Sequence, residues 1–197
     1  MFPFPKLRRL RQAQDLECYA STYTEYSGLG VPMAYLQKSE NRVYGIYRKG
    51  ELIGGFILAT GSCMRTLEVF AQADARKELY DMIGAATNFT EITCFWIAAD
   101  YRKNQLLNTY VWLALAISLR RFSKPGILFG TCSTSLARLY GVTPKSKLIH
   151  RDRINNKPTY IFRSERSSSL RGFFQILQFK WSRMRKIKEQ RKAKALV

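Results

Sequence analysis

The chain has 197 residues, a length that suits one domain with an appended tail. Hydrophobic residues make up 46% of it and aromatic residues 13%, which is ample for a buried core and excludes a disordered chain. Lys and Arg number 33 against 14 Asp and Glu, and the net charge of +19 favours a polyanionic partner. Nucleic acid, an anionic membrane, a phosphorylated cofactor and an acidic carrier protein all meet that description.

The cysteines and the single histidine restrict the kinds of site that the chain can form. Cys18, Cys63, Cys94 and Cys132 are widely spaced and include no CxxC pair. Because His150 is the only histidine, Cys/His zinc patterns are excluded and a nucleophile activated by histidine is disfavoured. We therefore expect free thiols in a reducing compartment, and no metal.

The N-terminus and the longest apolar run bear on localisation. Residues 1–12 hold no apolar core of the kind that a secretory signal needs. The apolar run 106–117 is interrupted by Asn108 and Thr109 and is too short to span a bilayer. We expect a cytoplasmic protein, with peripheral contact at a membrane left open.

In chain order, the first half predicts helices followed by a hairpin. Gly28 and Pro32 separate two helical patterns, and Lys49-Gly50 is a turn signal between two β-rich runs. The expected elements are a helix at 7–26, a short helix at 33–39, strands at 43–48 and 51–59, a short strand at 66–70 and a helix at 72–83.

The second half alternates strands and helices, which is typical of a βαβ unit. The expected elements are a strand at 91–98, a helix at about 103–121, a strand at 127–132, a short helix at 134–140 and strands at 146–151 and 158–163. Antiparallel neighbours come first and a βαβ unit follows. The chain therefore predicts an α/β (α+β) fold with one mixed, largely antiparallel sheet and helices on its faces.

The composition changes at residue 164, so we divide the chain into a body at 1–163 and a tail at 164–197. Residues 163–197 hold 11 Lys and Arg but only two Glu, a net charge of +9. Apolar residues of the tail follow helical spacing at Leu170, Phe173, Phe174, Leu177, Trp181 and Met184. This pattern predicts a basic amphipathic helix, which either packs on its own body or contacts a membrane surface or a partner.

Three short stretches within residues 5–163 resemble the GNAT superfamily of N-acyltransferases. They are IAADYRKNQLL at 97–107, TSLARLYG at 134–141 and PTYIF at 158–162. In that family a central strand splays from its parallel neighbour in a V, which the resemblance places near Ile97, between the strands at 91–98 and 127–132. An R/Q-x-x-G-x-G/A turn then opens a helix whose N–H groups hold the cofactor pyrophosphate. Arg102 stands on the first motif position, whereas Gln105 and Leu107 replace the glycines.

The resemblance implies an acyl thioester as donor. A helix N-terminus supplies N–H donors and a positive dipole without glycine. A degraded glycine motif is similar to acyl-homoserine lactone synthases and other fatty N-acyltransferases, whose donor is acyl carrier protein with a single phosphate. The implied donor is therefore acyl carrier protein or acyl coenzyme A, with a medium or long acyl chain. The implied donor-binding residues are Ile97, Ala98, Arg102, Lys103, Asn104, Gln105, Leu106, Leu107, Ser133 and Ser135.

The resemblance also implies two catalytic residues. Glu91 matches a glutamate that acts as general base in some members, and Tyr140 matches a tyrosine that protonates the leaving sulfur. Aminolysis of a thioester needs both, together with a donor that polarises the carbonyl, which backbone N–H groups near Ile97 and Ala98 would supply. Glu91 also reads as an ordinary strand-end carboxylate. The aromatic residues Phe56, Phe95 and Trp96 are candidates for an acyl pocket, or otherwise for the core.

These observations predict an N-acyltransferase that acts on a primary amine of a small molecule, amino acid or peptide. The alternative is a nucleic-acid- or ribosome-binding module on a non-catalytic GNAT-like scaffold, which would use the basic tail and its aromatic residues. We find no known nucleic-acid motif in the sequence, which favours the enzyme.

Overall fold

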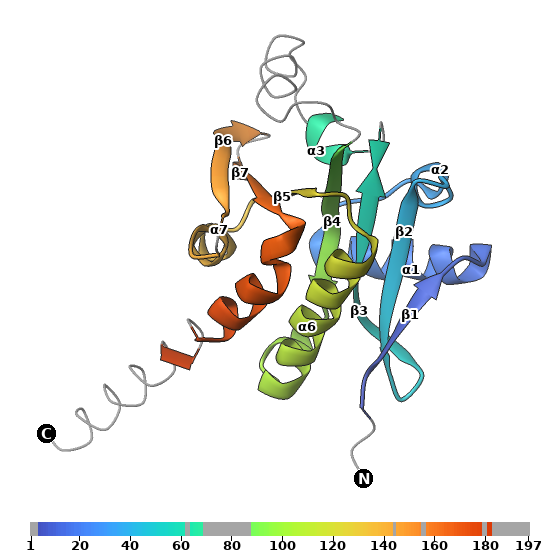
Figure 1. Cartoon of the computed structure of the whole chain (residues 1–197). Helices are drawn as coiled ribbons and strands as arrows, with labels where there is room; N and C mark the ends of the chain where they lie inside the picture. Colours follow the sequence, from blue (N-terminus) through green and yellow to red (C-terminus); the bar gives the residue numbers. More distant parts are fainter. Residues whose placement is uncertain are drawn as a thin grey trace, which may run out of the picture.

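The computed structural model describes residues 4–61, 64–68, 88–143, 145–154, 157–178 and 181–182. Within them, seven strands form one sheet in the order β1-β2-β3-β4-β5-β7-β6 (Figure 1). The strands are β1 (Lys6–Leu10), β2 (Asn41–Arg48), β3 (Glu51–Thr60), β4 (Phe89–Ile97), β5 (Gly126–Thr131), β6 (Lys147–Ile154) and β7 (Lys157–Glu165). Among these strands β4 and β5 form a parallel pair, and the other neighbours are antiparallel.

Helices cover both faces of the sheet. They are α1 (Ala13–Ser27), α2 (Met33–Leu36), α3 (Arg65–Glu68), α5 (Ala99–Arg102), α6 (Gln105–Phe122) and α7 (Thr134–Gly141), followed by the 3-10 helix η3 (Arg166–Ser168). A further helical segment at 169–178 follows η3. In Figure 1, α1 lies behind the sheet, whereas α6 and the segment 169–178 lie in front of it.

Two apolar clusters tie these helices to the sheet. On the side that we call the α1 face, the buried residues include Leu10, Leu16, Tyr19, Leu36, Val43, Ile57, Ala59 and Trp96. On the opposite α6 face, they include Tyr44, Phe56, Leu58, Trp112, Leu115, Phe129, Phe162, Phe173 and Ile176. Since successive strand residues point to opposite faces, β3 and β4 contribute to both clusters.

The predicted hairpin is confirmed. β2 and β3 pair over their whole length on either side of Lys49 and Gly50. Both turn residues have positive φ, 52° at Lys49 and 88° at Gly50. Positive φ at both central residues is the backbone of the tight turn whose twist matches that of two antiparallel strands.

The predicted helix at 7–26 is wrong at its beginning. Residues 6–10 form the edge strand β1, which pairs with β2 from Lys6 to Leu10, and the helix starts at Ala13. Leu7 and Leu10 are three residues apart, a spacing that fits one side of a helix but opposite faces of a strand. Leu10 packs in the α1-face cluster and Leu7 packs against the other side, so tertiary contacts decide in favour of the strand.

The predicted strand at 66–70 is also wrong, because residues 65–68 form helix α3. The backbone N–H of Thr66, in the first turn of α3, donates to the carboxylate of Glu91 on β4. Donors in the first turn of a helix have no partner within the helix, and here another strand supplies one. Residues 69–70 and the predicted helix at 72–83 lie outside the described residues.

The other predicted elements of the second half are confirmed with small shifts at their ends. Helix α6 begins at Gln105, after the separate turn α5 at 99–102. β7 runs to Glu165. Phe173 and Ile176 in the segment 169–178 are buried in the α6-face cluster, whereas Phe174 is 64% exposed. The helix predicted in the first part of the tail is therefore present, with one side against the body.

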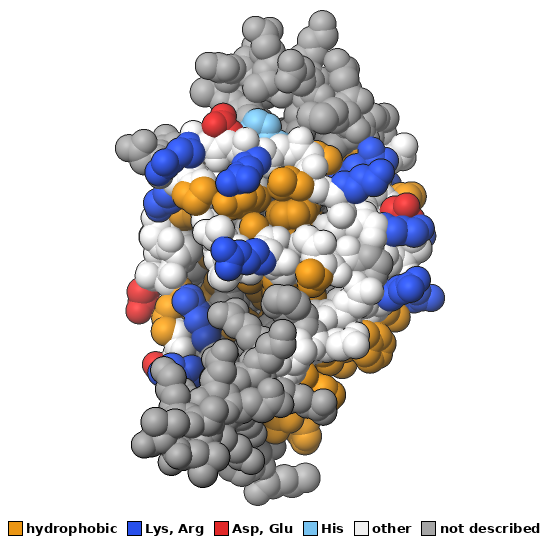
Figure 2. Space-filling view, turned by 90° about the vertical axis from the view of Figure 1, so that its left-hand side faces the viewer, with side chains coloured by type: hydrophobic (Ala, Val, Ile, Leu, Met, Phe, Trp, Pro, Cys, Tyr) orange, Lys and Arg blue, Asp and Glu red, His pale blue; other side chains and the backbone are white. Residues whose placement is uncertain are grey.

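Basic side chains lie along both edges of the sheet. β1 and β6 are the outer strands, and their sequences are KLRRL and KLIHRDRI. Figure 2 looks onto the side where β6 and α7 lie, and basic side chains surround small apolar areas there. Among the described residues, no helix has the length and hydropathy needed to cross a bilayer.

Candidate active site

The two parallel strands at the centre of the sheet separate and leave a V. Their ladder has four pairs, from Phe89 and Gly126 to Ile92 and Phe129. Beyond that point β4 continues to Ile97 beside β3, while β5 follows β7. The parallel pairing predicted for these strands is confirmed, but the separation begins at Ile92 instead of near Ile97. The V is therefore deeper than the sequence predicted.

A β-bulge shapes the arm of the V that β4 forms. The register between β3 and β4 shifts between Gly55 and Ile57, and Cys94 opposite this shift has a φ of 50°. The hydroxyl of Tyr19 donates to the carbonyl of Cys94 at 2.8 Å and so holds this conformation. Burial raises the pKa of Cys94, which keeps the thiol protonated and makes it a poor nucleophile.

Backbone N–H groups at the end of β4 differ in their availability. The N–H of Ala98 donates to the carbonyl of Ile53 at 2.9 Å, so it faces β3 and is occupied. Successive N–H groups along a strand point to opposite sides, so the N–H of Ile97 faces the V. Of the two predicted donors to the thioester carbonyl, Ile97 has the suitable direction and Ala98 does not.

The predicted donor-binding turn is exposed and partly self-bonded. Residues 102–106 are exposed, with Leu106 at 84%. Asn104 caps α6, its Oδ1 accepting from the N–H of Leu107 at 3.1 Å. Arg102 Nε donates to the carbonyl of Ile97 at 2.7 Å, which ties the turn to the end of β4. Lys103 and Gln105 thus remain as exposed polar side chains beside the N-terminus of α6.

Glu91 lies one residue before the last parallel pair, on the α1 face opposite Ala59. It is buried, and its Oε1 accepts hydrogen bonds from the N–H of Thr66 at 2.8 Å and from the Thr66 hydroxyl. The methyl of Thr66 would lie 3.6 Å from a Cβ placed on Gly130 of β5. α3 therefore bridges β4 and β5 just where their ladder ends. Thr66 was not predicted as a site residue, because residues 66–70 have the pattern of a strand.

Tyr140 lies on the opposite, α6 face of the V. Its ring packs edge-on against Phe129 at 4.8 Å, Phe162 at 5.8 Å and Trp112 at 6.2 Å between ring centroids. Burial raises the pKa of Tyr140 above its ordinary value, so the phenol stays protonated at neutral pH. A protonated phenol beside the last parallel pair is suited to give a proton to a leaving group.

Ser133 is the N-cap of α7, and its hydroxyl accepts from the N–H of Leu136 at 3.4 Å. The same hydroxyl is 2.9 Å from that of Ser135. A capping role accounts for Ser133 without a donor, since serine is a preferred N-cap residue. Ser135 is exposed beside it.

The three aromatic residues predicted to form an acyl pocket do not converge. Phe95 packs on Trp112 of the α6 face, with ring centroids 5.0 Å apart, whereas Trp96 stacks on Tyr26 of α1 at 5.3 Å. Phe56 is fully buried in the α6-face cluster. Successive strand residues point to opposite faces, so Phe95 and Trp96 cannot form the wall of one pocket.

An apolar cavity does lie on the α6 face, between the sheet, α6 and the segment 169–178. Its volume is about 70 Å³. Most of the residues that line it are apolar, among them Ile92, Trp112, Leu115, Ala116, Ile127, Phe129, Tyr140, Phe173 and Ile176, and the polar residues Thr143, Ser164, Glu165, Ser168 and Ser169 contribute as well. It adjoins both the last parallel pair and Tyr140.

A wider cavity of about 750 Å³ lies at the far end of β4, near Asn88 and Phe89. Arg120, Arg163 and Arg166 contribute to its lining. It contains none of the residues at the V, so its size does not make it the reaction site. Across the described residues, no group of three or more His, Cys, Asp or Glu side chains is placed to hold a metal ion.

Comparison by sequence finds no matching family model and no matching curated protein. Comparison by structure finds several similar folds. The N-acyl amino acid synthase FeeM from uncultured soil microbes has a TM-score of 0.63 at 12% identity, over 85% of this chain and 93% of that one. A ribosomal-protein alanine N-acetyltransferase from Escherichia coli has a TM-score of 0.58 at 9% identity, over 82% and 94%.

An acyl-CoA N-acyltransferase from Pseudomonas aeruginosa is similar too, with a TM-score of 0.55 at 10% identity over 82% of this chain and 99% of that one. All three neighbours are N-acyltransferases by description, and each alignment covers more than four fifths of this chain. This chain has the GNAT fold. At these identities the likeness establishes the GNAT architecture, and the V between β4 and β5 is the feature of it that holds the candidate site.

Proposed function

We propose that the protein is an N-acyltransferase, which moves an acyl group from a thioester to a primary amine. The observation that carries this proposal is the open V between β4 and β5, with Glu91 on one side and Tyr140 on the other. The neighbours with this GNAT architecture, described as acetyl- and acyltransferases, support the same reaction class.

The proposed reaction uses residues on both faces of the sheet. The amine nitrogen attacks the thioester carbonyl, a C–N bond forms, and the C–S bond then breaks. The N–H of Ile97 faces the V and stabilises the oxyanion. The amine loses its proton to Glu91, and the thiolate takes a proton from the phenol of Tyr140.

Thr66 provides a route for the proton that Glu91 receives. The carboxylate of Glu91 is buried, and the hydroxyl of Thr66 already donates to it. An amine that donates to the Thr66 oxygen would pass its proton to that oxygen as the hydroxyl proton moves to Glu91. This relay explains how Glu91 can act as the base although its carboxylate is buried below the surface of the V.

For the donor, we propose a medium or long acyl chain on acyl carrier protein or coenzyme A. The exposed turn at 102–106 presents Arg102 and Lys103 next to the N-terminus of α6, where a phosphate is stabilised. With Asn104 capping the helix and no glycine in the turn, a single phosphate fits this surface better than a closely held pyrophosphate. The basic body suits an acidic carrier.

For the acceptor, we propose a small amine, an amino acid or a peptide that approaches from the α1 face. Glu91 and Thr66 lie on that face, and aromatic residues of α1 and β4 flank it, with Tyr26 stacked on Trp96. The description of FeeM as an N-acyl amino acid synthase makes amino acids the first acceptors to test.

The proposal is tested by incubating the protein with acetyl, octanoyl, decanoyl and palmitoyl thioesters of coenzyme A and of carrier protein, together with amino acids, polyamines and short peptides. We expect free thiol to be released only when an amine is present, and a product whose mass has increased by one acyl group. Glu91→Gln is the matched control. Absence of thiol release with every donor, together with RNA binding that weakens steeply with salt, would instead identify a binding module.

A further inference from the structure

The segment 169–178 forms one wall of the apolar cavity on the α6 face. Phe173 and Ile176 are its buried residues, and both line the cavity together with Gly172. α6 forms the facing wall through Leu115 and Ala116. The cavity therefore lies between the tail and the body of the chain, under a helix that follows the last strand of the sheet.

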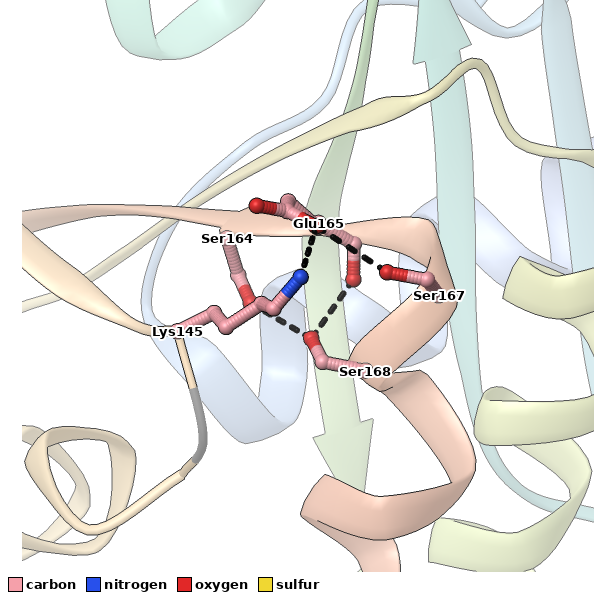
Figure 3. Close-up of polar contacts among 5 residues, drawn as sticks. All are labelled: Lys145, Ser164, Glu165, Ser167 and Ser168. Atoms are coloured by element: carbon pink, nitrogen blue, oxygen red, sulfur yellow. Dashed lines mark hydrogen bonds and ion pairs between the residues drawn. The ribbon is translucent and has the colours of Figure 1, made fainter.

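Hydrogen bonds at its beginning fix this wall to the sheet (Figure 3). The hydroxyl of Ser168 donates to the carbonyl of Glu165 at 2.6 Å and lies 3.1 Å from that of Ser164. Lys145 and Ser167 both donate to the carboxylate of Glu165, at 2.6 and 3.0 Å. A helix anchored in this way holds Phe173 and Ile176 at a defined depth.

The inner end of the cavity meets the proposed reaction centre. Ile92 and Phe129, the last parallel pair, line it, and so does Tyr140. A thioester whose carbonyl faces Ile97 and whose sulfur faces Tyr140 would direct its acyl chain along this wall. The lining at that depth is apolar, as a hydrocarbon chain requires.

Protein cores are close-packed, so an apolar cavity that extends from the surface to core residues needs an explanation. A water molecule needs roughly 10–15 Å³ of cavity volume, so about 70 Å³ accommodates a few groups of that size. A methylene is of similar size. The space thus matches the distal half of a medium-chain acyl group, whereas an acetyl group would leave it empty.

We propose that this cavity receives the distal part of a medium-chain acyl group and that the segment 169–178 sets the length of chain accepted. The inference rests on the proposed function and deepens it, since it names the acyl class and the wall that selects it. The tail thus takes part in substrate recognition through Phe173 and Ile176.

Ala116→Leu tests this inference by filling the cavity from the α6 side. We expect kcat/KM for decanoyl-coenzyme A to fall about 100-fold, within the range for one or a few methylenes in an apolar pocket. Transfer from acetyl-coenzyme A should be unchanged, because that group does not reach the cavity. Ile117→Ala, at an exposed position of the same helix, is the matched control and should alter neither donor.

Ile176→Ala tests the opposite wall, and it provides a second test if Ala116→Leu does not fold. Enlarging the cavity should move the preferred donor to a longer chain, with kcat/KM for dodecanoyl-coenzyme A rising relative to octanoyl-coenzyme A about tenfold. If Ala116→Leu raises the melting temperature and Ile176→Ala lowers it, with the chain-length profile unchanged in both, the void is a packing defect and the inference is overturned.

Binding of decanoate, measured by calorimetry, separates this inference from the proposed function. Decanoate that binds the unmodified protein but not Ala116→Leu supports the cavity even if no thioester is ever consumed, and the proposed function then fails alone. If the protein turns over acetyl-coenzyme A but does not bind decanoate, the proposed function is supported and the acyl-chain site is rejected.

Discussion

The two faces of the sheet differ sharply at the point where β4 and β5 separate. On the α1 face the carboxylate of Glu91 accepts two hydrogen bonds from Thr66, and Tyr19 holds the carbonyl of Cys94. On the α6 face the ring of Tyr140 meets other aromatic rings beside an apolar cavity. Under the proposed function, proton transfer from the amine and recognition of the acyl chain would occur on opposite sides of one strand pair, so each could be altered separately.

The largest expected effect is on the α1 face. Glu91→Gln keeps the shape of the side chain but removes the base, so turnover should fall roughly 10²–10⁴-fold, the range for a lost general base. The loss should shrink as pH rises, because more of the amine is then already neutral. Steady-state rates measured between pH 6 and 10 with an unchanged donor check both points. A loss that stays constant with pH would assign Glu91 a structural role.

The relay through Thr66 predicts the next effect. Thr66→Val removes the hydroxyl and keeps the branched shape, and turnover should fall roughly 10²-fold, the lower end of the range for acid–base assistance. Thr66→Ser keeps the hydroxyl and should restore most of the rate. The two variants compared by kcat, with circular dichroism as the check of folding, decide between relay and packing. Equal rates in both variants would contradict the relay.

On the α6 face, Tyr140→Phe should cost less, about tenfold in turnover, because a thiolate is a good leaving group without full protonation. Donor KM should change little, since only the hydroxyl is lost. Burial raises the pKa of Tyr140, so its phenol remains protonated as pH rises through 9. The rate of the unmodified protein should therefore not fall between pH 7 and 9 through loss of the Tyr140 proton. The Tyr140→Phe variant should show the same pH dependence over this range, and pH–rate profiles of both proteins test this.

The smallest effect is expected away from both faces, at the exposed turn before α6. Lys103→Ala should raise the donor KM a few-fold at low salt and less at high salt, because exposed charges are screened over about 10 Å at 0.1 M ionic strength. Lys103 is a cleaner test than Arg102, whose side chain also holds the carbonyl of Ile97. Donor KM at two salt concentrations is the measurement, and a salt-independent KM would exclude phosphate contact at this turn.

The order of strands and helices was predictable where turn residues and apolar runs agree, as at Lys49-Gly50 and in β4. β1 was not predictable, because Leu7 and Leu10 fit a helix as well as a strand that contacts both clusters. α3 was not predictable either, because the deciding contact is between Thr66 and Glu91, 25 residues apart. Such contacts have no local signal, because they arise only when the strands have paired.

The candidate site was also predictable only in part. Glu91, Ile97 and Tyr140 come from short motifs, and the structure brings all three around the V, although their roles stay predictions. The N–H of Ala98 is occupied because it faces β3, which depends on how the strands pair. Phe95 and Trp96 lie on opposite faces because side chains alternate along a strand. The cavity beneath the segment 169–178 was beyond sequence reasoning, since it depends on how closely two helices pack.

The basic edges of the sheet lead to a different account of the net charge. An outer strand offers a row of backbone groups to which another chain can add, and charged side chains discourage that addition. On β1 the charged side chains are Lys6, Arg8 and Arg9, and on β6 they are Lys147, Arg151, Asp152 and Arg153. Two copies that met edge to edge would bring like charges together. Positive charge at the edges thus disfavours addition of a second copy there, and this part of the +19 requires no polyanionic partner to explain it.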